Sequence, residues 1–429
     1  MDIVRTFGEQ VFASLSVRNY RLYFAGIGIS QVGTWMQIVA LGWLVLELTG
    51  SGTQLGAILA LRFIPLLLGS LHAGALVDRI DKRTLLYVTQ SISAALAVTL
   101  GTLVFFDVVA MWMLYVAAVL FGCTDVIDRP ARQTFIHEMV GPERLRNAVA
   151  LNSTEVNLAR ALGPLFAGVL IASAGTVLCF FANAISYLIF LVFLVAIREK
   201  DLHREFHEER KVDHLFSGLY YVTSTPLLLT VLVTMAVVGT LAYEFQTTLP
   251  LFAHTTFLGS AADYAAFLSA MGAGSVAGGL FSASRGSINP QEFALWAFLF
   301  GLSLCITALS PTLGLATVGM VFVGFFSICL TSTGNTMIQL ESASHMRGRV
   351  MSLWTMAIFG STVIGAPIVG FIGEHASPRW ALILGGFAGM LAAIFAARRL
   401  IKAGRFFFIP IPAFIFVRRE EAAVENART

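Results

Sequence analysis

The stretch from Met111 to Phe135, MWMLYVAAVLFGCTDVIDRPARQTF, joins an apolar run to a cluster of charges. The run up to Cys123 contains no charged residue. Four charged residues then follow closely: Asp125, Asp128, Arg129 and Arg132. The whole chain of 429 residues is 57% hydrophobic and 12% charged, whereas a soluble domain carries roughly twice that charged fraction. The composition therefore predicts a membrane protein, in which these charges need an explanation.

Runs of about 20 apolar residues recur along the chain, and each is long enough to cross about 30 Å of hydrocarbon as a helix. We predict an all-α polytopic membrane protein with about twelve transmembrane helices. The predicted spans lie near 21–48, 53–78, 84–106, 110–137, 146–172, 176–197, 226–252, 262–284, 291–310, 312–338, 348–373 and 378–400.

A charged linker, REKDLHREFHEERKVDH from Arg198, divides these spans six plus six. We expect an N-terminal six-helix bundle over 1–197, a cytoplasmic linker over 198–225, a C-terminal six-helix bundle over 226–400 and a cytoplasmic tail over 401–429. Basic residues concentrate in every second loop, and the opposite loops hold only Arg379. By the positive-inside rule, both termini are expected to be cytoplasmic.

The two halves of the sequence contain matching segments. LHAGALVDRIDKR at Leu71 is matched by SVAGGLFSASRGS at Ser275, about 204 residues later, and Pro164 is matched by Pro367 at almost the same offset. A common offset predicts a duplicated six-helix unit. Parallel repeats that meet at a central substrate site are the architecture of one large class of transporters.

GALVDRIDKRTLL resembles the signature loop between the second and third helices of the major facilitator superfamily. Its residues of interest are Gly74, Asp78, Arg79, Asp81, Lys82 and Arg83. Asp81 stands where the family pattern has a second glycine, so a tight or strained turn is expected. The resemblance implies the major facilitator fold and a loop that latches a cytoplasmic gate. The alternative is a plain basic turn.

DRPARQTF, followed by LRNAVALNSTEVNLARALGPLFAG, is similar to the bacterial exporter branch that includes the enterobactin exporter and the macrolide-efflux proteins. The resemblance runs over roughly residues 14–400. Gly163, Pro164 and Gly168 partly match the antiporter motif of the fifth helix, with alanine at two usual glycine positions. The resemblance implies efflux from a bacterial cell across its inner membrane.

On a helix, Asp125 with Arg129 and Asp128 with Arg132 are i,i+4 pairs on nearly one face. Charges at membrane depth normally face protein or water and pair with one another. We interpret the four as one half of an inner gate, facing the Asp78–Arg83 loop. The alternative is a direct proton-carrying role for Asp125.

A buried carboxylate beside a movable arginine can alternate between a protonated and a salt-bridged state. The candidate proton-coupling residues are Asp125, Glu244, Glu155, Arg160 and Arg62. Glu155 lies about 140° around the helix from Arg160, so these two should not pair. Static ion pairs that orient helices are the alternative.

Polar stripes along the spans predict substrate contacts. The candidates are Gln31, Thr34, Trp35, Asn157, Thr248, Asn335 and Gln339. The resemblance implies that helices 1, 4, 7 and 10 surround the cavity. An aromatic lining with few polar groups suits a small amphipathic substrate.

The sequence contains no GxxxxGK[ST], HExxH or GxSxG motif, so we expect no enzyme activity, no cofactor and no metal, and a proton gradient as the energy source. The expected partners are the lipid bilayer, protons and substrate, without nucleic acid, for a chain functional as a monomer. We predict a proton-coupled antiporter that exports small amphipathic molecules by alternating access. A proton-coupled importer or symporter, and a non-transporting receptor or scaffold, remain the alternatives.

Overall fold

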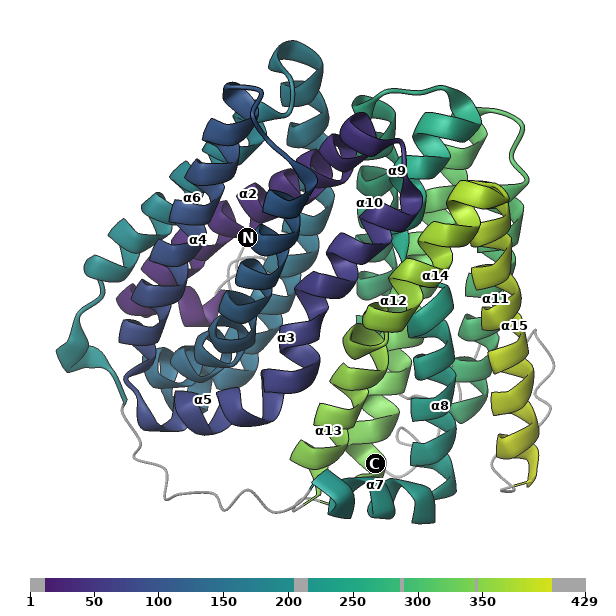
Figure 1. The fold of residues 1–429 in the computed structure, drawn as a ribbon. Coiled ribbons are helices and arrows are strands. Elements are labelled where there is room, and N and C mark those ends of the chain that lie inside the picture. The colour runs from purple at the N-terminus through teal and green to yellow at the C-terminus, as the bar shows by residue number, and fades with distance from the viewer. Residues whose placement is uncertain (1–11, 204–214, 286–288, 344–345, 403–429) are drawn as a thin grey trace, which may run out of the picture.

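The computed structural model describes residues 12–203, 215–285, 289–343 and 346–402, and these are helical almost throughout (Figure 1). The N-terminal half consists of η1 (Ala13–Ser16), α2 (Arg18–Thr49), α3 (Gly52–Arg79), α4 (Lys82–Phe105), α5 (Met111–Ala174), α6 (Val177–Val195) and η2 (Glu199–Asp201). The C-terminal half consists of α7 (Leu215–Ser224), α8 (Pro226–Leu241), α9 (Phe245–Leu251), η3 (Phe252–Thr256), α10 (Ala261–Ala283), α11 (Pro290–Ala308), α12 (Leu313–Glu341), α13 (Arg347–Thr355), η4 (Met356–Gly360), α14 (Thr362–His375) and α15 (Pro378–Lys402).

Eleven helical segments of the described chain are long and apolar enough to cross a membrane. The 64-residue segment α5 turns at Gly141, whose φ of 67° and ψ of 176° interrupt the helix before Pro142. Only glycine adopts such a backbone conformation without strain. With α5 counted on each side of this turn, the segments supply the twelve crossings predicted from the sequence. The helix continues past Pro130, so the predicted end of a span near residue 137 lies at Gly141.

Two spans of the C-terminal half are interrupted. The seventh consists of α8, α9 and the π-helical η3, with a non-helical step at Ala242–Glu244 between the first two. The eleventh consists of α13, the π-helical η4 and α14. Interruptions of this kind free backbone carbonyls and are frequent at functional sites.

The segment predicted as linker carries structure of its own at its end. Residues 215–224 form α7, which packs against α8 and α13. Most of the charged linker and nearly all of the aromatic tail over 401–429 lie outside the described residues.

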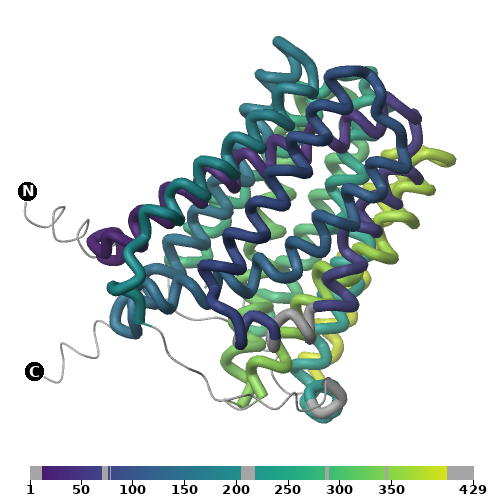
Figure 2. Tube along the Cα trace, turned by 60° about the vertical axis from the view of Figure 1, so that its left-hand side comes forward, coloured from purple at the N-terminus to yellow at the C-terminus, as the bar shows by residue number. Residues whose placement is uncertain are grey.

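The long helices run between the same two ends of the molecule, and the halves stand side by side (Figures 1 and 2). We call the end that carries the turns after Arg79, at Gly141 and before Arg347 the basic end. Helix α3 packs along α14, and α5 packs along α10. These two contacts provide most of the junction between the halves.

The junction is tightest away from the basic end. A Cβ atom on Gly56 would lie 2.3 Å from the carbonyl oxygen of Ala366, so the backbones of α3 and α14 are almost in contact. Beside this contact, Glu374 accepts hydrogen bonds from the Ser51 hydroxyl at 2.7 Å and from the Thr53 backbone N–H at 2.8 Å. Close backbone approach at small residues is the usual way in which membrane helices associate.

Toward the basic end the halves separate. Among the described residues, α12 and α13 pack mainly on elements of their own half, and α13 stands apart from α3 in Figure 1. Among the described residues, contacts between the halves therefore become sparse toward the basic end, which we call the open end, and the contact of α3 with η4 lies at the limit of the close packing.

Gly56→Val should lower the midpoint of thermal unfolding, because the added methyl groups collide with the backbone of α14. Overpacking of this kind costs about 1–3 kcal/mol. Gly279→Val in α10 is the matched control, since no atom lies within 4 Å of its Cβ position. Equal midpoints for the two variants in detergent would contradict the close packing of α3 on α14.

Candidate transport site

Asp125 lies on α5 between two arginines. Its Oδ2 atom accepts hydrogen bonds from Arg62 of α3, at 3.1 Å from Nη2 and 3.3 Å from Nε. Arg129, one turn further along α5, lies 3.9 Å from the same oxygen. The side chain of Asp125 is 29% exposed. Two cations from two helices therefore share one carboxylate. Asp125 is the counter-charge that a largely buried Arg62 requires.

This group touches the other half of the molecule. The Arg129 guanidinium lies over the ring of Phe359 in η4, 5.5 Å from its centroid. Phe63 of α3 stacks on the same ring, with centroids 6.4 Å apart and planes inclined by 9°. Arg129 therefore connects Asp125 to η4 of the other half, at the place where the close contacts between the halves end.

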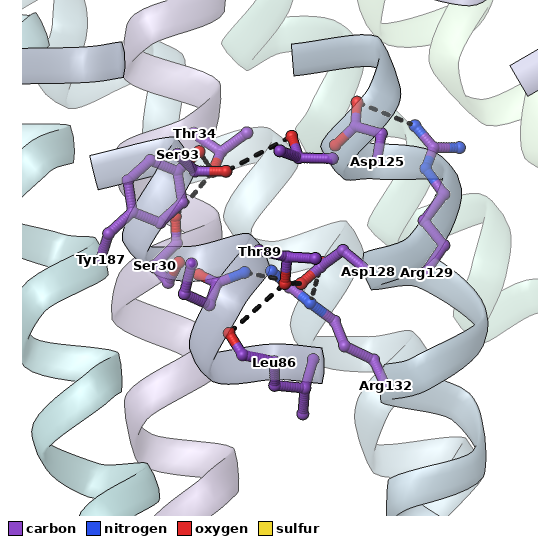
Figure 3. A network of polar contacts seen from close by, with 12 residues as sticks. Ser30, Thr34, Leu86, Thr89, Ser93, Asp125, Asp128, Arg129, Arg132 and Tyr187 are labelled. Atoms are coloured by element: carbon purple, nitrogen blue, oxygen red, sulfur yellow. Dashed lines mark hydrogen bonds and ion pairs between the residues drawn. The ribbon is translucent and has the colours of Figure 1, made fainter. Parts of the chain in front are cut away.

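Asp128 belongs to a second, more deeply buried group (Figure 3). Its Oδ1 atom accepts hydrogen bonds from Thr89 at 2.8 Å and Gln90 at 2.7 Å, both on α4, and its Oδ2 atom contacts Arg132. Arg132 also lies over the ring of Phe190 in α6. Both predicted i,i+4 pairs are confirmed, but the expectation of one common face is wrong: Asp125 and Arg129 face α3 and η4, whereas Asp128 and Arg132 face α4 and α6.

The turn between α3 and α4 is fixed to its own half. Asp81 caps α4 by accepting hydrogen bonds from the backbone N–H and the hydroxyl of Thr84. Its φ of −57° is ordinary, so the expected strain is absent. Arg83 donates to the carbonyls of Leu194 and Val195 at the end of α6.

Two ion pairs complete these attachments. Arg83 pairs with Glu199 at 2.6 Å, and Lys82 lies 4.0 Å from Glu138. Arg79 is exposed at the end of α3. Gly74 and Asp78 lie in the same helix, but their side chains fall outside the described residues.

Glu155 is 7% exposed on the part of α5 that follows Gly141. Both of its carboxylate oxygens are buried without a hydrogen-bond partner in the described part of the chain. It lies against Gly28 of α2 and, as predicted, does not pair with Arg160. The hydroxyl of Tyr23, which interacts electrostatically with Glu155, is also buried without a partner.

Glu244 occupies the non-helical step between α8 and α9 and is 3% exposed. Its Oε1 atom has no hydrogen-bond partner and lies 3.0 Å from the Cβ position of Gly365 in α14. Thr248, one turn further, is also 3% exposed. The two share a small pocket with residues of α11 and α15. Thr248 is thus enclosed within the C-terminal bundle of the described structure, and its role as a substrate contact stays a prediction.

Arg160 has no counter-charge among the residues that the structure describes. Its guanidinium lies over the ring of Trp35 in α2, 5.4 Å from the centroid, and its Nε atom is buried without a hydrogen-bond partner. Tyr243, from the step after α8, is its electrostatic neighbour in the other half.

The remaining predicted substrate contacts are held within single halves. Thr34 donates to the carbonyl of Ser30 and lies 3.2 Å from the Tyr187 hydroxyl in α6 (Figure 3). Asn157 donates to the carbonyl of Ser153. Gln339 donates to Asn335 one turn before it on α12, and Gln31 is half-buried on α2.

The antiporter-type motif serves helix packing. Gly163 and Pro164 are buried in α5, where Gly163 lies against the Cβ atom of Trp35. Gly168 is equally buried and lies against Ala265 of α10. The motif thus seats α5 between α2 and the other half, which places Arg160 at the junction.

Sequence reasoning missed three residues of this site. Phe359 and Phe63 carry no polar signal, and Tyr243 looks like one more aromatic residue of a span. The Tyr243 hydroxyl donates to the carbonyl of Ser327 on α12 at 2.9 Å. The one signal in the sequence was that Tyr243 directly precedes Glu244, a carboxylate within an apolar run.

Asp128→Ala should destabilise the protein by about 3–5 kcal/mol, because it leaves Arg132 buried without its counter-charge. Arg129→Ala is the control and should cost at most about 1 kcal/mol, since that side chain is 43% exposed. The double change Asp128→Leu with Arg132→Leu should recover much of the loss. Unfolding in sodium dodecyl sulfate measures the stability of all three variants. Equal small losses of stability in Asp128→Ala and Arg129→Ala would contradict a buried Asp128–Arg132 pair.

The chain matches the model of the transmembrane secretion effector family over residues 9–404. It is 24% identical to the staphyloferrin A transporter of Staphylococcus aureus, over 78% of this chain and 85% of that protein. It is 25% identical to the multidrug efflux pump Tap of Mycolicibacterium fortuitum, over 80% and 86%. It is 23% identical to the enterobactin exporter EntS of Escherichia coli O1:K1, over 90% and 93%.

Solved structures share the fold at lower identity. A bacterial homologue of the human lysosomal transporter Spinster, in an inward-facing and unoccupied conformation, superposes with a TM-score of 0.72 at 13% identity, over 91% of this chain and 99% of that one. The peptide transporter POT superposes with a TM-score of 0.73 at 15% identity, over 90% and 94%. With the twelve crossings and the family match, these likenesses establish a multi-pass membrane transporter rather than an enzyme. The chain belongs to the transmembrane secretion effector family of the major facilitator superfamily.

Proposed function

We propose that the chain is a proton-coupled antiporter that exports small amphipathic molecules across a bacterial inner membrane. The observation that carries this proposal is the position of Asp125, a partly exposed carboxylate held by Arg62 and Arg129 where the two halves meet. An ionised carboxylate at this depth is stable because two guanidinium groups compensate its charge.

Protonation of Asp125 changes the forces at the junction. The neutral acid loses its attraction to both arginines, and Arg62 then holds a charge without a partner. Arg129 rests on Phe359 of the other half, so a change at Asp125 reaches η4 and the open end directly. A proton can thereby shift the balance between two arrangements of the halves, which is what coupled transport requires.

The placement of basic residues gives the direction of this cycle. The basic end faces the cytoplasm by the positive-inside rule, so the described arrangement opens inward with Asp125 ionised. In this cycle substrate enters from the cytoplasm while Asp125 is ionised, and the loaded chain closes at the basic end. Asp125 then takes up a proton from the outer side as the substrate leaves, and releases that proton to the cytoplasm when the basic end opens again. The names of the relatives, which include an efflux pump and a siderophore exporter, favour export over import.

The inner gate follows from how the turn after α3 is attached. Arg83 and Lys82 tie this turn to α6, to Glu199 beyond it and to α5, so it moves with the N-terminal bundle as one body. The buried Asp128–Arg132 pair holds α4 and α5 together within that body. In this proposal these groups stiffen one side of the gate, and Arg129 meets the other side.

The test uses everted membrane vesicles with an acidic interior, to which N-phenyl-1-naphthylamine and candidate siderophores are added. Wild-type protein should accumulate a transported compound inside the vesicles until the pH gradient is collapsed. Asp125→Asn should abolish the gradient-driven accumulation, because the residue can no longer bind and release a proton.

Asp107→Asn is the matched control, since Asp107 lies exposed in the turn between α4 and α5. Glu244→Gln and Glu155→Gln compare the other two buried carboxylates. Accumulation that persists in Asp125→Asn would move the proton site elsewhere. Gradient-driven exit of compound would favour an importer, and a lack of any gradient-dependent movement across the panel would favour a non-transporting role.

A further inference from the structure

Arg160 is a cation in the membrane interior with no anion beside it. It lies mid-way along the part of α5 that follows Gly141, and forms no ion pair with any described residue. Its guanidinium lies over the ring of Trp35, and Tyr243 of the other half is an electrostatic neighbour. A charge at this depth is costly unless it is compensated, so the missing partner requires an explanation.

The three carboxylates that could have been the counter-charge of Arg160 lie in other surroundings. Asp125 is shared by Arg62 and Arg129. Glu155 is enclosed against Gly28 on another face of α5, and Glu244 is enclosed against Gly365 within the C-terminal bundle. A partner for Arg160 therefore has to come from outside the described chain.

The guanidinium has room for such a partner. Its Nε atom is enclosed, but its two Nη atoms are not enclosed and form no hydrogen bond with the described residues. Two free NH₂ groups at the end of a planar fork match the geometry of a carboxylate, sulfonate or phosphate. The enclosed Nε and the Trp35 ring fix the orientation of this fork.

Each half contributes one aromatic residue to the surroundings of Arg160. Trp35 comes from α2, and Tyr243 comes from the step between α8 and α9. The Tyr243 hydroxyl is held by Ser327 of α12, which donates to it at 2.8 Å and accepts from it through its backbone carbonyl. The indole ring is thus fixed over the cation, and the phenol of its electrostatic neighbour is held in place by α12 of the other half, as a site for an aromatic ligand requires.

We propose that Arg160 binds the oxyanion of the transported molecule, so that the substrates are aromatic or amphipathic acids rather than cationic drugs. This inference rests on the proposed function for the direction of transport only, because the binding site needs no gradient. The anion supplies the charge that Arg160 lacks, and its apolar body lies along Trp35 and Tyr243. A ligand held in this way touches both halves and favours their approach.

The test is equilibrium binding to the purified, detergent-solubilised chain without any gradient. Two probes with one aromatic framework are compared, 8-anilinonaphthalene-1-sulfonate and the neutral N-phenyl-1-naphthylamine. Arg160→Gln should weaken binding of the sulfonate by at least about tenfold and leave the neutral probe unchanged, because only the sulfonate uses the charge-assisted bonds. Arg160→Lys should fall between wild type and Arg160→Gln, since it keeps the charge without the fork.

Arg398→Gln is the control for the loss of one positive charge, since Arg398 is exposed near the end of α15, and it should bind both probes as wild type does. If the Arg160 variants fail to fold, the wild type alone decides: it should bind the sulfonate more tightly than the neutral probe. Equal binding of the two probes would overturn the proposal. So would an equal loss for both probes in Arg160→Gln, or displacement of the sulfonate by phosphatidylglycerol, which would assign Arg160 to a lipid headgroup.

Discussion

A charge within the hydrocarbon core is stable only beside an opposite charge or water, and the arrangement around Asp125 follows from that constraint. Arg62 and Arg129 come from different helices and converge on one oxygen of this carboxylate. The shared oxygen holds α3 to α5, and Arg129 carries the same interaction onto Phe359 of the other half. The contact between charge and ring lies where the tight junction of small residues ends and the open end begins.

The two halves divide the chemistry unequally. The N-terminal half carries a paired carboxylate at the junction and the buried Asp128–Arg132 pair behind it, which makes it a stiff body with one responsive point. The C-terminal half carries the interruptions: the step at Glu244, between α8 and α9, and the π-helical η4. Freed carbonyls at such interruptions let a helix change shape at small cost. In the proposed cycle, the proton acts on the stiff half at Asp125, and the substrate anion acts at Arg160 beside the interrupted seventh span.

Much of this architecture could be predicted from the sequence, because membrane spans, basic loops and i,i+4 pairs depend on local spacing alone. The lack of pairing between Glu155 and Arg160 followed from helix geometry in the same way. For the anion that pairs with Arg62, the sequence left three candidate carboxylates: Asp125, Glu155 and Glu244. The choice among them depends on how α3 is rotated against α5, which the sequence does not give. The enclosure of Thr248 within the C-terminal bundle could not be predicted, because the sequence gives no sign that the helix is interrupted at residues 242–244. Phe359 was missed because an aromatic ring in an apolar span gives no signal until its neighbour is known.

The central claim is that the charge on Asp125 sets the separation of the two halves at the basic end. Spin labels at Glu143 and Gly348, both exposed at that end, report this separation by pulsed electron paramagnetic resonance in lipid nanodiscs. In the described structure Asp125 lies between Arg62 and Arg129, which stabilise its ionised form, so acidification should shift the distance distribution of the wild type toward shorter values. Asp125→Asn should show the short distances at every pH. An unchanged pH response in Asp125→Asn would contradict the claim and would assign the switch to another group.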